Sequence, residues 1–187
     1  MEKKFNFLKE AISTVKTSGT IIPSSRFLAE KMLKNIDFDK AEVIVELGSG
    51  NGAITKHILN KMNKQTKLVC FEINESFHQE LSKIKHCQMT ILKSSAENIN
   101  EELDKLGFKE ADYVVSGLPL TMIPNEISEN ILIETHKSLK KGGRFVQFQY
   151  SLDYYKKLKS IFSKENVSLN FEPLNFPPAF IYSCIKK

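Results

Sequence analysis

Short apolar runs rich in β-branched residues alternate along the chain with segments whose apolar residues recur every three or four positions. The first pattern predicts buried strands, and the second predicts amphipathic helices. The predicted strands are Val43–Leu47, Leu68–Glu72, Met89–Leu92, Tyr113–Ser116 and Arg144–Tyr150. The predicted helices between them are Ala53–Met62, Glu75–Lys83, Asn98–Leu106 and Asn125–Leu139. Such alternation predicts a parallel sheet with helices on both faces.

The N-terminal residues 1–34 depart from this alternation and predict two helices. The first spans Glu2–Lys16, with one apolar stripe made by Phe5, Leu8, Ile12 and Val15. The second is capped by Ser24 or Ser25 and runs through Phe27, Leu28 and Met32. We expect this helical segment to precede a core at residues 35–187, within a single domain of 187 residues.

The C-terminal part predicts a change of strand direction. Lys140-Lys141-Gly142-Gly143 is interpreted as a helix stop with a C-cap glycine. A helix over Tyr154–Phe162 then precedes two strands at Val167–Phe171 and Ala179–Ile185. The proline-containing link between these strands is too short for a crossover helix, so they should pair antiparallel. The expected fold is therefore α/β, with a mainly parallel seven-stranded sheet that ends in an antiparallel hairpin.

The stretch VIVELGSGNGAIT at Val43–Thr55 predicts a strand, a Gly-rich turn and the start of a helix. The strand ends near the acidic Glu46, and the turn contains Gly48, Gly50 and Gly52. Glycines suit such a turn because the backbone needs positive φ and a ligand must approach it closely. The glycine spacing alone permits a dinucleotide such as NAD. Glu46-x-Gly-x-Gly-x-Gly more closely resembles motif I of the class I S-adenosyl-L-methionine (AdoMet, SAM) methyltransferases, in which the turn lies against the methionine portion of the cofactor.

A second acidic residue at a strand end supports a nucleoside cofactor. Glu72 follows the second predicted strand and lies 20 residues beyond Gly52. A carboxylate at this place can accept both ribose hydroxyls, which suits NAD as well as AdoMet. Parallel strands carry active-site loops at their carboxyl ends. The predicted cofactor-binding residues at these ends are Glu46, Gly48, Ser49, Gly50, Gly52, Glu72, Ile73, Ser95, Ala96, Glu97, Ser116, Gly117 and Leu118.

Charge and composition narrow the choice of partner and compartment. The net charge of +5 is uneven: residues 1–34 carry seven Lys/Arg against three acids, and residues 140–187 carry nine against three. Basic ends favour an anionic surface, either nucleic acid or lipid headgroups, or are simply solvated lysines. No apolar run approaches about 20 residues, so no membrane-spanning helix is expected. Three scattered Cys and four His without ligand spacing predict neither a disulfide framework nor a metal site, and favour the cytosol.

The loop after the fourth strand distinguishes between methyl acceptors. Amino-directed nucleic-acid methyltransferases carry Asn/Asp-Pro-Pro-Tyr or Asn-Leu-Pro-Tyr here, whereas this chain has Ser116-Gly117-Leu118-Pro119-Leu120. The missing aromatic ring would remove roughly 1–3 kcal/mol of stacking on a flipped base. This sequence therefore disfavours a nucleic-acid base as the acceptor.

Several segments together resemble the bacterial phospholipid N-methyltransferase family. They are Gly19–Arg26 (GTIIPSSR), Ser116–Leu120, Gly142–Ser151 (GGRFVQFQYS) and Asn175–Ala179 (NFPPA), in the same order as in that family. The resemblance implies AdoMet as cofactor and methylation of a phosphatidylethanolamine amine at the inner face of the cytoplasmic membrane. Gln149 departs from the family, which more often shows Thr, and this puts headgroup selectivity in doubt. The rRNA adenine N6-dimethyltransferases are a more distant resemblance.

The loop after the fifth strand supplies the predicted acceptor site. Tyr150 is the candidate to hold the amine, Asp153 its charge partner or proton acceptor, and Ser116 a lining residue. The first helix, with Lys beside its apolar stripe, suits the headgroup region of a membrane or else packs on the sheet. The alternatives are an rRNA adenine N6-methyltransferase, a small-molecule amine methyltransferase and a cofactor-binding regulator without catalysis.

Overall fold

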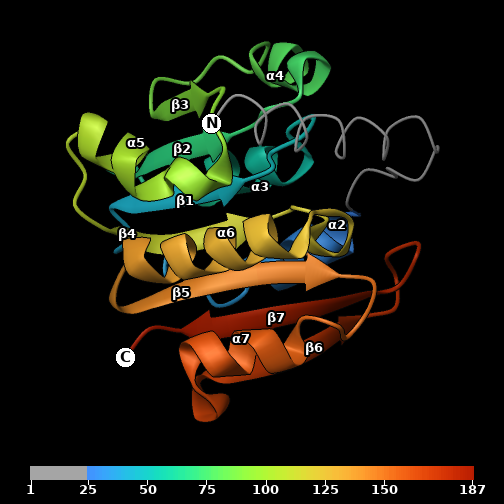
Figure 1. The fold of residues 1–187 in the computed structure, drawn as a ribbon. Helices are drawn as coiled ribbons and strands as arrows, with labels where there is room; N and C mark the ends of the chain where they lie inside the picture. Colours follow the sequence, from blue (N-terminus) through green and yellow to red (C-terminus); the bar gives the residue numbers. More distant parts are fainter. Residues whose placement is uncertain (1–24) are drawn as a thin grey trace.

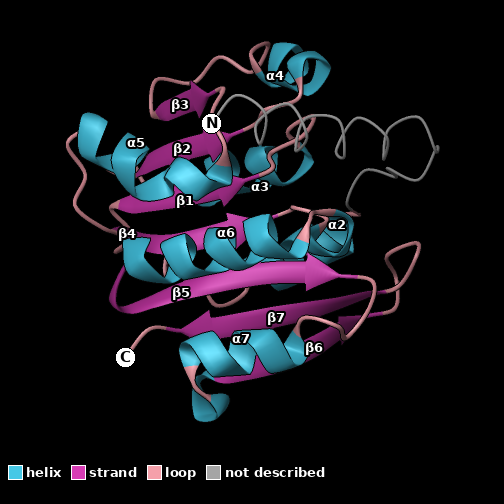
Figure 2. Cartoon of the chain, in the orientation of Figure 1, coloured by secondary structure: helices cyan, strands magenta, loops and turns pink. Residues whose placement is uncertain are grey.

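The computed structural model describes residues 25–187, and a seven-stranded sheet lies at their centre (Figures 1 and 2). The strand order is β3-β2-β1-β4-β5-β7-β6, and β7 runs antiparallel to both β5 and β6 while the other pairs are parallel. The predicted mainly parallel sheet with a terminal antiparallel hairpin is confirmed. The strands are β1 Val43–Leu47, β2 Lys67–Phe71, β3 Met89–Leu92, β4 Ala111–Ser116, β5 Leu139–Gln149, β6 Val167–Glu172 and β7 Ala179–Ile185.

Helices cover both faces of the sheet, as the alternating pattern predicts. Val43, Val45 and Leu47 of β1 point into one apolar core, which α5, α6 and α7 close. Ile44 points into a second core on the other face, closed by α2, α3 and α4. Successive strand residues face opposite sides, so a buried strand feeds both cores. The helices are α2 Arg26–Leu33, α3 Ala53–Lys61, α4 Glu75–Leu81, α5 Ile99–Lys105, α6 Asn125–Ser138 and α7 Tyr155–Phe162, with short 3-10 turns η1 Ala96–Asn98, η2 Leu120–Met122 and η3 Lys164–Asn166.

Strand register brings the carboxyl ends of the parallel strands to one edge. Leu47 pairs with both Phe71 and Ser116, and Ser116 pairs with Gln147. The loops that follow β1, β2 and β4 are therefore neighbours. The link between β6 and β7 lies at the same edge, where the arrowheads of β4 and β5 also end (Figure 1).

The N-terminal expectations are met in part. Ser25 caps α2, because its Oγ accepts a hydrogen bond from the Leu28 N–H at 3.2 Å. The helix predicted over Glu2–Lys16 lies outside the described residues. Across residues 25–187, no helix combines the length and the apolar character that a membrane crossing requires.

The predicted C-cap glycine in Lys140–Gly143 is wrong. α6 ends at Ser138, and the next residue, Leu139, is already extended and buried in β5, where it pairs with Ala111. Gly142 has a φ of 80°, but it lies within the long strand β5, beside an irregularity in the β4–β5 register. Its positive φ thus accompanies an irregularity in strand pairing, a place where glycine also commonly occurs.

Candidate active site

Backbone hydrogen bonds hold the glycine turn after β1 against β2. The N–H groups of Gly48 and Ser49 donate to the Phe71 carbonyl oxygen at 2.9 and 3.3 Å. The N–H of Gly52 donates to the Ser49 carbonyl at 2.9 Å and closes the turn. Gly48, Gly50 and Gly52 have φ values of 69°, 56° and 82°. The sequence motif is therefore a left-handed turn fixed to the neighbouring strand.

The glycine turn also packs directly on the loop after β4. A Cβ on Gly48 would lie 2.7 Å from Cδ2 of Leu118, and a Cβ on Gly117 would lie 3.0 Å from the Gly48 carbonyl oxygen. Both positions need glycine because backbone and side chain approach so closely. At Gly50, by contrast, a Cβ would meet no atom within 4 Å. This open side leaves the bare backbone accessible to a ligand.

Glu72 joins the glycine turn to the loop after β2. Its Oε2 accepts from the Gly50 N–H at 2.8 Å, and its Oε1 accepts from the Asn74 N–H at 2.7 Å. Burial raises the pKa of Glu72, while the hydrogen bonds from Asn74, Gly50 and Ile73 lower it. A carboxylate offers about four acceptor positions, so capacity remains for the ribose hydroxyls of a nucleoside. The open glycine turn and this acceptor fit AdoMet.

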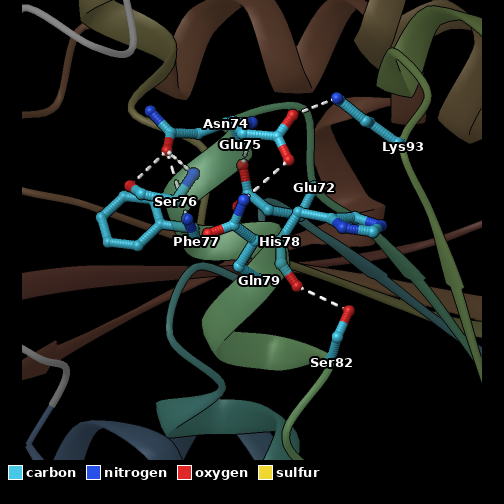
Figure 3. A network of polar contacts seen from close by, with 9 residues as sticks. All are labelled: Glu72, Asn74, Glu75, Ser76, Phe77, His78, Gln79, Ser82 and Lys93. Carbon is cyan, nitrogen blue, oxygen red and sulfur yellow. Dashed lines mark hydrogen bonds and ion pairs between the residues drawn. The ribbon is translucent and has the colours of Figure 1, made fainter.

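The loop that carries Glu72 is anchored by the cap of α4 (Figure 3). Asn74 is the N-cap residue, and its Oδ1 accepts from the N–H groups of Ser76 and Phe77 at 3.1 and 3.2 Å. Ile73, between the two, is buried. The position of the Glu72 carboxylate is therefore fixed from both sides, by the glycine turn and by the helix cap.

Glu46 lies inside the protein, below the glycine turn. It is 1% exposed, and its Oε2 accepts from the Thr55 hydroxyl at 2.6 Å and from the Cys70 thiol at 3.6 Å. Burial raises the pKa of Glu46 to about 7, against the lowering effect of these hydrogen bonds. The contacts that hold this oxygen tie β1 to α3 and β2. Its place among the cofactor-binding residues stays a prediction.

The predicted residues after β3 form the short turn η1. Ser95 caps it, because its Oγ accepts from the Glu97 N–H at 3.3 Å. Ser95 and Ala96 are buried, and the Glu97 carboxylate accepts from the Asn130 side chain of α6 at 3.0 Å. Leu92 pairs with Phe71, so this turn follows the strand next to the Glu72 loop.

Two glutamines of β5 fix the loop after β4, and neither is among the predicted cofactor-binding or catalytic residues, although Gln149 is the position that departs from the resembled family. The Nε2 atoms of Gln147 and Gln149 donate to the Leu118 carbonyl at 3.0 and 2.9 Å. The Ser116 hydroxyl accepts from the Leu118 N–H at 3.3 Å and is 1% exposed. Buried polar residues at alternate positions of an apolar strand were the available signal. Ser116 therefore shapes the loop, and its predicted lining role stays a prediction.

Tyr150 lies at the rim of the predicted acceptor site, directly after β5. Its side chain is partly exposed, and its ring meets that of Phe148 edge to face at 5.7 Å. Burial of the phenol raises the pKa of Tyr150, although a hydrogen bond with Asn175 lowers it. A tyrosine hydroxyl is ordinarily neutral near pH 7, and its oxygen can accept a hydrogen bond from an ammonium group.

Asp153 is exposed and lies in the turn between β5 and α7. Its Oδ2 accepts from the Ser151 hydroxyl at 2.7 Å, and the Ser151 carbonyl accepts from the Tyr182 hydroxyl at 2.8 Å. No residue caps α7 through its side chain, so Asp153 is not the cap of that helix. Within the described part of the chain, no three His, Cys, Asp or Glu side chains gather as metal ligands.

Comparisons with known proteins identify the family. The family model described as methyltransferase small domain matches residues 11–171. An ornithine lipid N-methyltransferase of Singulisphaera acidiphila is 29% identical over 186 residues, covering 98% of this chain and 96% of the relative. Two solved structures share the fold. The precorrin-6y C5,15-methyltransferase of Geobacter metallireducens has a TM-score of 0.69 and 16% identity, over 90% of this chain and 92% of that one. The magnesium protoporphyrin IX methyltransferase of Synechocystis with bound SAM has a TM-score of 0.64 and 10% identity, over 85% and 76%.

These findings confirm the predicted Rossmann-like methyltransferase fold and the predicted cofactor, AdoMet, in place of the dinucleotide alternative. When bound, AdoMet supplies an electrophilic methyl group on a sulfonium. The family match covers far more than half of the described residues as well as part of the N-terminal segment. The chain is an AdoMet-dependent methyltransferase and belongs to the family of the methyltransferase small domain.

Proposed function

We propose that the protein methylates the amine of a lipid headgroup, phosphatidylethanolamine-like, at a membrane surface. The observation that carries this proposal is the similarity to an ornithine lipid N-methyltransferase along nearly the whole of both chains. Ornithine lipid and phosphatidylethanolamine differ in their headgroups but share an amine on a lipid. That amine is the common chemistry, and it is the acceptor we propose.

Methyl transfer to this amine needs a neutral nitrogen aligned with the sulfonium carbon. A new N–C bond forms as the S–C bond breaks, and the nitrogen loses one proton. An alkylammonium has a pKa near 10.4, so roughly one molecule in a thousand is neutral at pH 7. Removing the proton therefore costs about 4–5 kcal/mol, which the site must offset by proton acceptance and positioning.

Tyr150 and Asp153 divide this work in the proposal. The phenol oxygen of Tyr150 accepts a hydrogen bond from the ammonium and orients the nitrogen. The exposed carboxylate of Asp153, on the same loop, takes the proton to solvent. Ser116, Gly117 and Leu118 line the site on the side of the glycine turn, since Leu118 packs on Gly48.

The loop after β4 supports a lipid amine rather than a nucleic-acid base. Leu120 stands where base methyltransferases place an aromatic ring, and it is fully buried. Its carbonyl accepts from the Tyr154 hydroxyl at 2.7 Å, which holds this residue inside the core. A flipped base would find no stacking surface at this position.

An acceptor assay tests the proposal. Labelled AdoMet is offered with phosphatidylethanolamine vesicles, ornithine lipid vesicles, rRNA and free ethanolamine, each in a separate reaction. We expect label in the lipid fractions, with a tenfold or greater preference over free ethanolamine. Label in rRNA would overturn the lipid assignment and favour the rRNA methyltransferase, and equal labelling of free ethanolamine would overturn it and favour the small-molecule amine methyltransferase.

A further inference from the structure

Large apolar side chains are exposed around the edge that carries the acceptor site. Phe176 is 77% exposed and Leu174 is 63% exposed, both in the link between β6 and β7. Phe27 at the start of α2, and Tyr150 and Leu152 after β5, are each about half exposed. We call these five residues the apolar rim. They come from three separate segments, so their exposure is not an accident of one loop.

The β6–β7 link is uncharged and firmly held at its base. No charged residue occurs between positions 173 and 185. Glu172, at the end of β6, pairs with Lys31 at 3.3 Å and accepts from the Leu174 N–H at 2.9 Å. The Asn175 side chain is buried and donates to the Pro177 carbonyl at 2.7 Å. The fold therefore presents two apolar side chains on an anchored support, which limits the entropy lost when they bind a partner.

The N-terminal segment joins the described chain beside this link. The Ser25 N–H donates to Oδ1 of Asn175 at 3.0 Å, so residues 1–24 connect to the fold at the base of the rim. That segment carries four Lys against two Glu. The chain thus enters the described fold beside an uncharged apolar surface, and the residues before this point are net basic in sequence, a combination that suits an anionic lipid surface better than a protein partner.

We propose that the apolar rim is the surface by which the enzyme docks on an anionic phospholipid bilayer, with Leu174 and Phe176 inserted at the headgroup boundary. The inference rests on the proposed function, because a lipid amine must reach Tyr150 while its acyl chains remain in the bilayer. Insertion of the β6–β7 link places the half-exposed Tyr150 at headgroup depth. The proposed partner is a membrane. The alternative partner is a second copy of the chain, and the experiments below distinguish the two.

A fluorescence probe tests insertion directly, because the chain contains no Trp. Phe176→Trp introduces one reporter at the rim, and Ile133→Trp introduces one at a 38% exposed position on α6 as the matched control. With vesicles of phosphatidylglycerol and phosphatidylcholine, the emission of Phe176→Trp should shift to shorter wavelength and that of Ile133→Trp should not. Vesicle binding without a shift in Phe176→Trp would overturn the proposal.

A loss-of-binding variant provides the second test. Leu174→Ser with Phe176→Ser removes the two most exposed large apolar groups of the described residues, and thermal unfolding verifies the fold. Vesicle binding should weaken at least about tenfold. The proposal would be overturned if this double variant bound vesicles as tightly as wild type. It would also be overturned if the double variant lost self-association but kept vesicle binding.

These outcomes separate docking from function. Phosphatidylcholine and phosphatidylglycerol have no amine to methylate, so the vesicles report docking alone. If the wild-type enzyme methylates lipid while Phe176→Trp shows no shift, docking fails and the function stands. If Phe176→Trp shifts while no lipid is methylated, the proposed acceptor fails and the docking surface stands.

Discussion

At the scale of single residues, two carboxylates at neighbouring strand ends are both buried but have different partners. Glu46 is still within β1 and points to the same face as Ile44, where α3 covers it. Glu72 comes one residue after β2 has ended, and its side chain turns toward the Gly50 amide. A shift of one residue along a strand reverses the face. The motif predicts that both acids are near the turn, but sequence alone does not say which one faces the ligand.

The same limit explains why the contacts of Gln147 and Gln149 with the Leu118 carbonyl were not predicted. Their function is to donate to one carbonyl on a neighbouring strand, and that contact follows from the β4–β5 register. A single sequence carries the residue types but not the register. The glycine turn was predictable because its φ values are a local property.

Replacing Glu72 should weaken the cofactor site. Glu72→Ala removes both the acceptor for the ribose hydroxyls and the partner of the Gly50 amide, so AdoMet affinity should fall at least about tenfold. Isothermal titration calorimetry measures it. Glu80→Ala, at an exposed ion pair with Lys83, is the matched control and should bind as wild type. Unchanged affinity of Glu72→Ala would refute the ribose assignment.

Burial of Glu46 should make stability depend on pH. Because the pKa of Glu46 rises from 4.5 to about 7 on folding, the folded state binds this proton more tightly than the unfolded chain. The stabilisation from this protonated carboxyl is fully present below about pH 4.5. It is lost as the pH rises from 4.5 toward 7, and above about pH 7 the free energy of unfolding no longer depends on this group. Glu46→Gln cannot titrate, so the free energy of unfolding of wild type relative to this variant should fall by about 2 kcal/mol between pH 5 and 8. Urea unfolding at several pH values measures it, and a constant difference would contradict the buried carboxyl.

Removing the Tyr150 hydroxyl should affect the acceptor and not the cofactor. In Tyr150→Phe, the ammonium loses one hydrogen bond, so kcat/KM for the lipid should fall about tenfold. AdoMet affinity should stay as in wild type, because the cofactor residues are on other strands. Tyr155→Phe, whose ring lies against Tyr182, is the control with a tyrosine outside the site. Equal kcat/KM values in wild type and Tyr150→Phe would remove Tyr150 from the acceptor site.

At the scale of elements, apolar pattern predicted the strands well and the helix ends less well. β1, β3 and β7 have the predicted bounds, because buried strands are short apolar runs between polar turns. The sequence predicts that the glycines at 142 and 143 end α6, because a glycine pair after a periodic segment resembles a helix stop. The helix instead ends at Ser138, and β5 begins at the next residue. β5 begins directly after α6 because Leu139 pairs with Ala111 of β4. This pairing is a tertiary contact, which the local sequence pattern does not contain.

Two adjacent glycines, Gly142 and Gly143, lie where the β4–β5 register is irregular, and their replacement should lower stability by different amounts. Gly142→Ala places a side chain at a φ of 80° with no neighbour within 4 Å, so only backbone strain of about 1–2 kcal/mol should result. Gly107→Ala, at a φ of 81° and equally open, is the control and should cost a similar amount. Gly143→Ala should cost more, because its Cβ would lie 2.8 Å from the Lys140 carbonyl. Urea unfolding gives all three values, and equal stability of wild type and Gly142→Ala would refute the strain.

At the scale of the whole molecule, the sheet order places the loops with the predicted cofactor-binding residues beside the loops with the candidate residues for the methyl acceptor. The predicted cofactor-binding residues lie at the carboxyl ends of β1, β2, β3 and β4, and the acceptor candidates lie at the ends of β4 and β5. Alternation of strands and helices predicted this shared edge, because parallel strands end on the same side. The position of β7 between β5 and β6 was not predicted, yet it brings the β6–β7 link to that edge.

Attachment to a membrane should therefore have two components that respond differently to salt. Lys3, Lys4, Lys9 and Lys16 each contribute about 1 kcal/mol near an anionic surface, an attraction that salt screens. Changing all four to Gln should weaken binding to phosphatidylglycerol vesicles at low salt and have little effect at 1 M salt, where the Debye length is about 3 Å. Leu174→Ser with Phe176→Ser should weaken binding at both salt concentrations, because apolar burial is not screened. Flotation at the two salt concentrations measures vesicle binding of each variant. The same salt response in both variants would show that the apolar rim and the basic segment do not contribute separately.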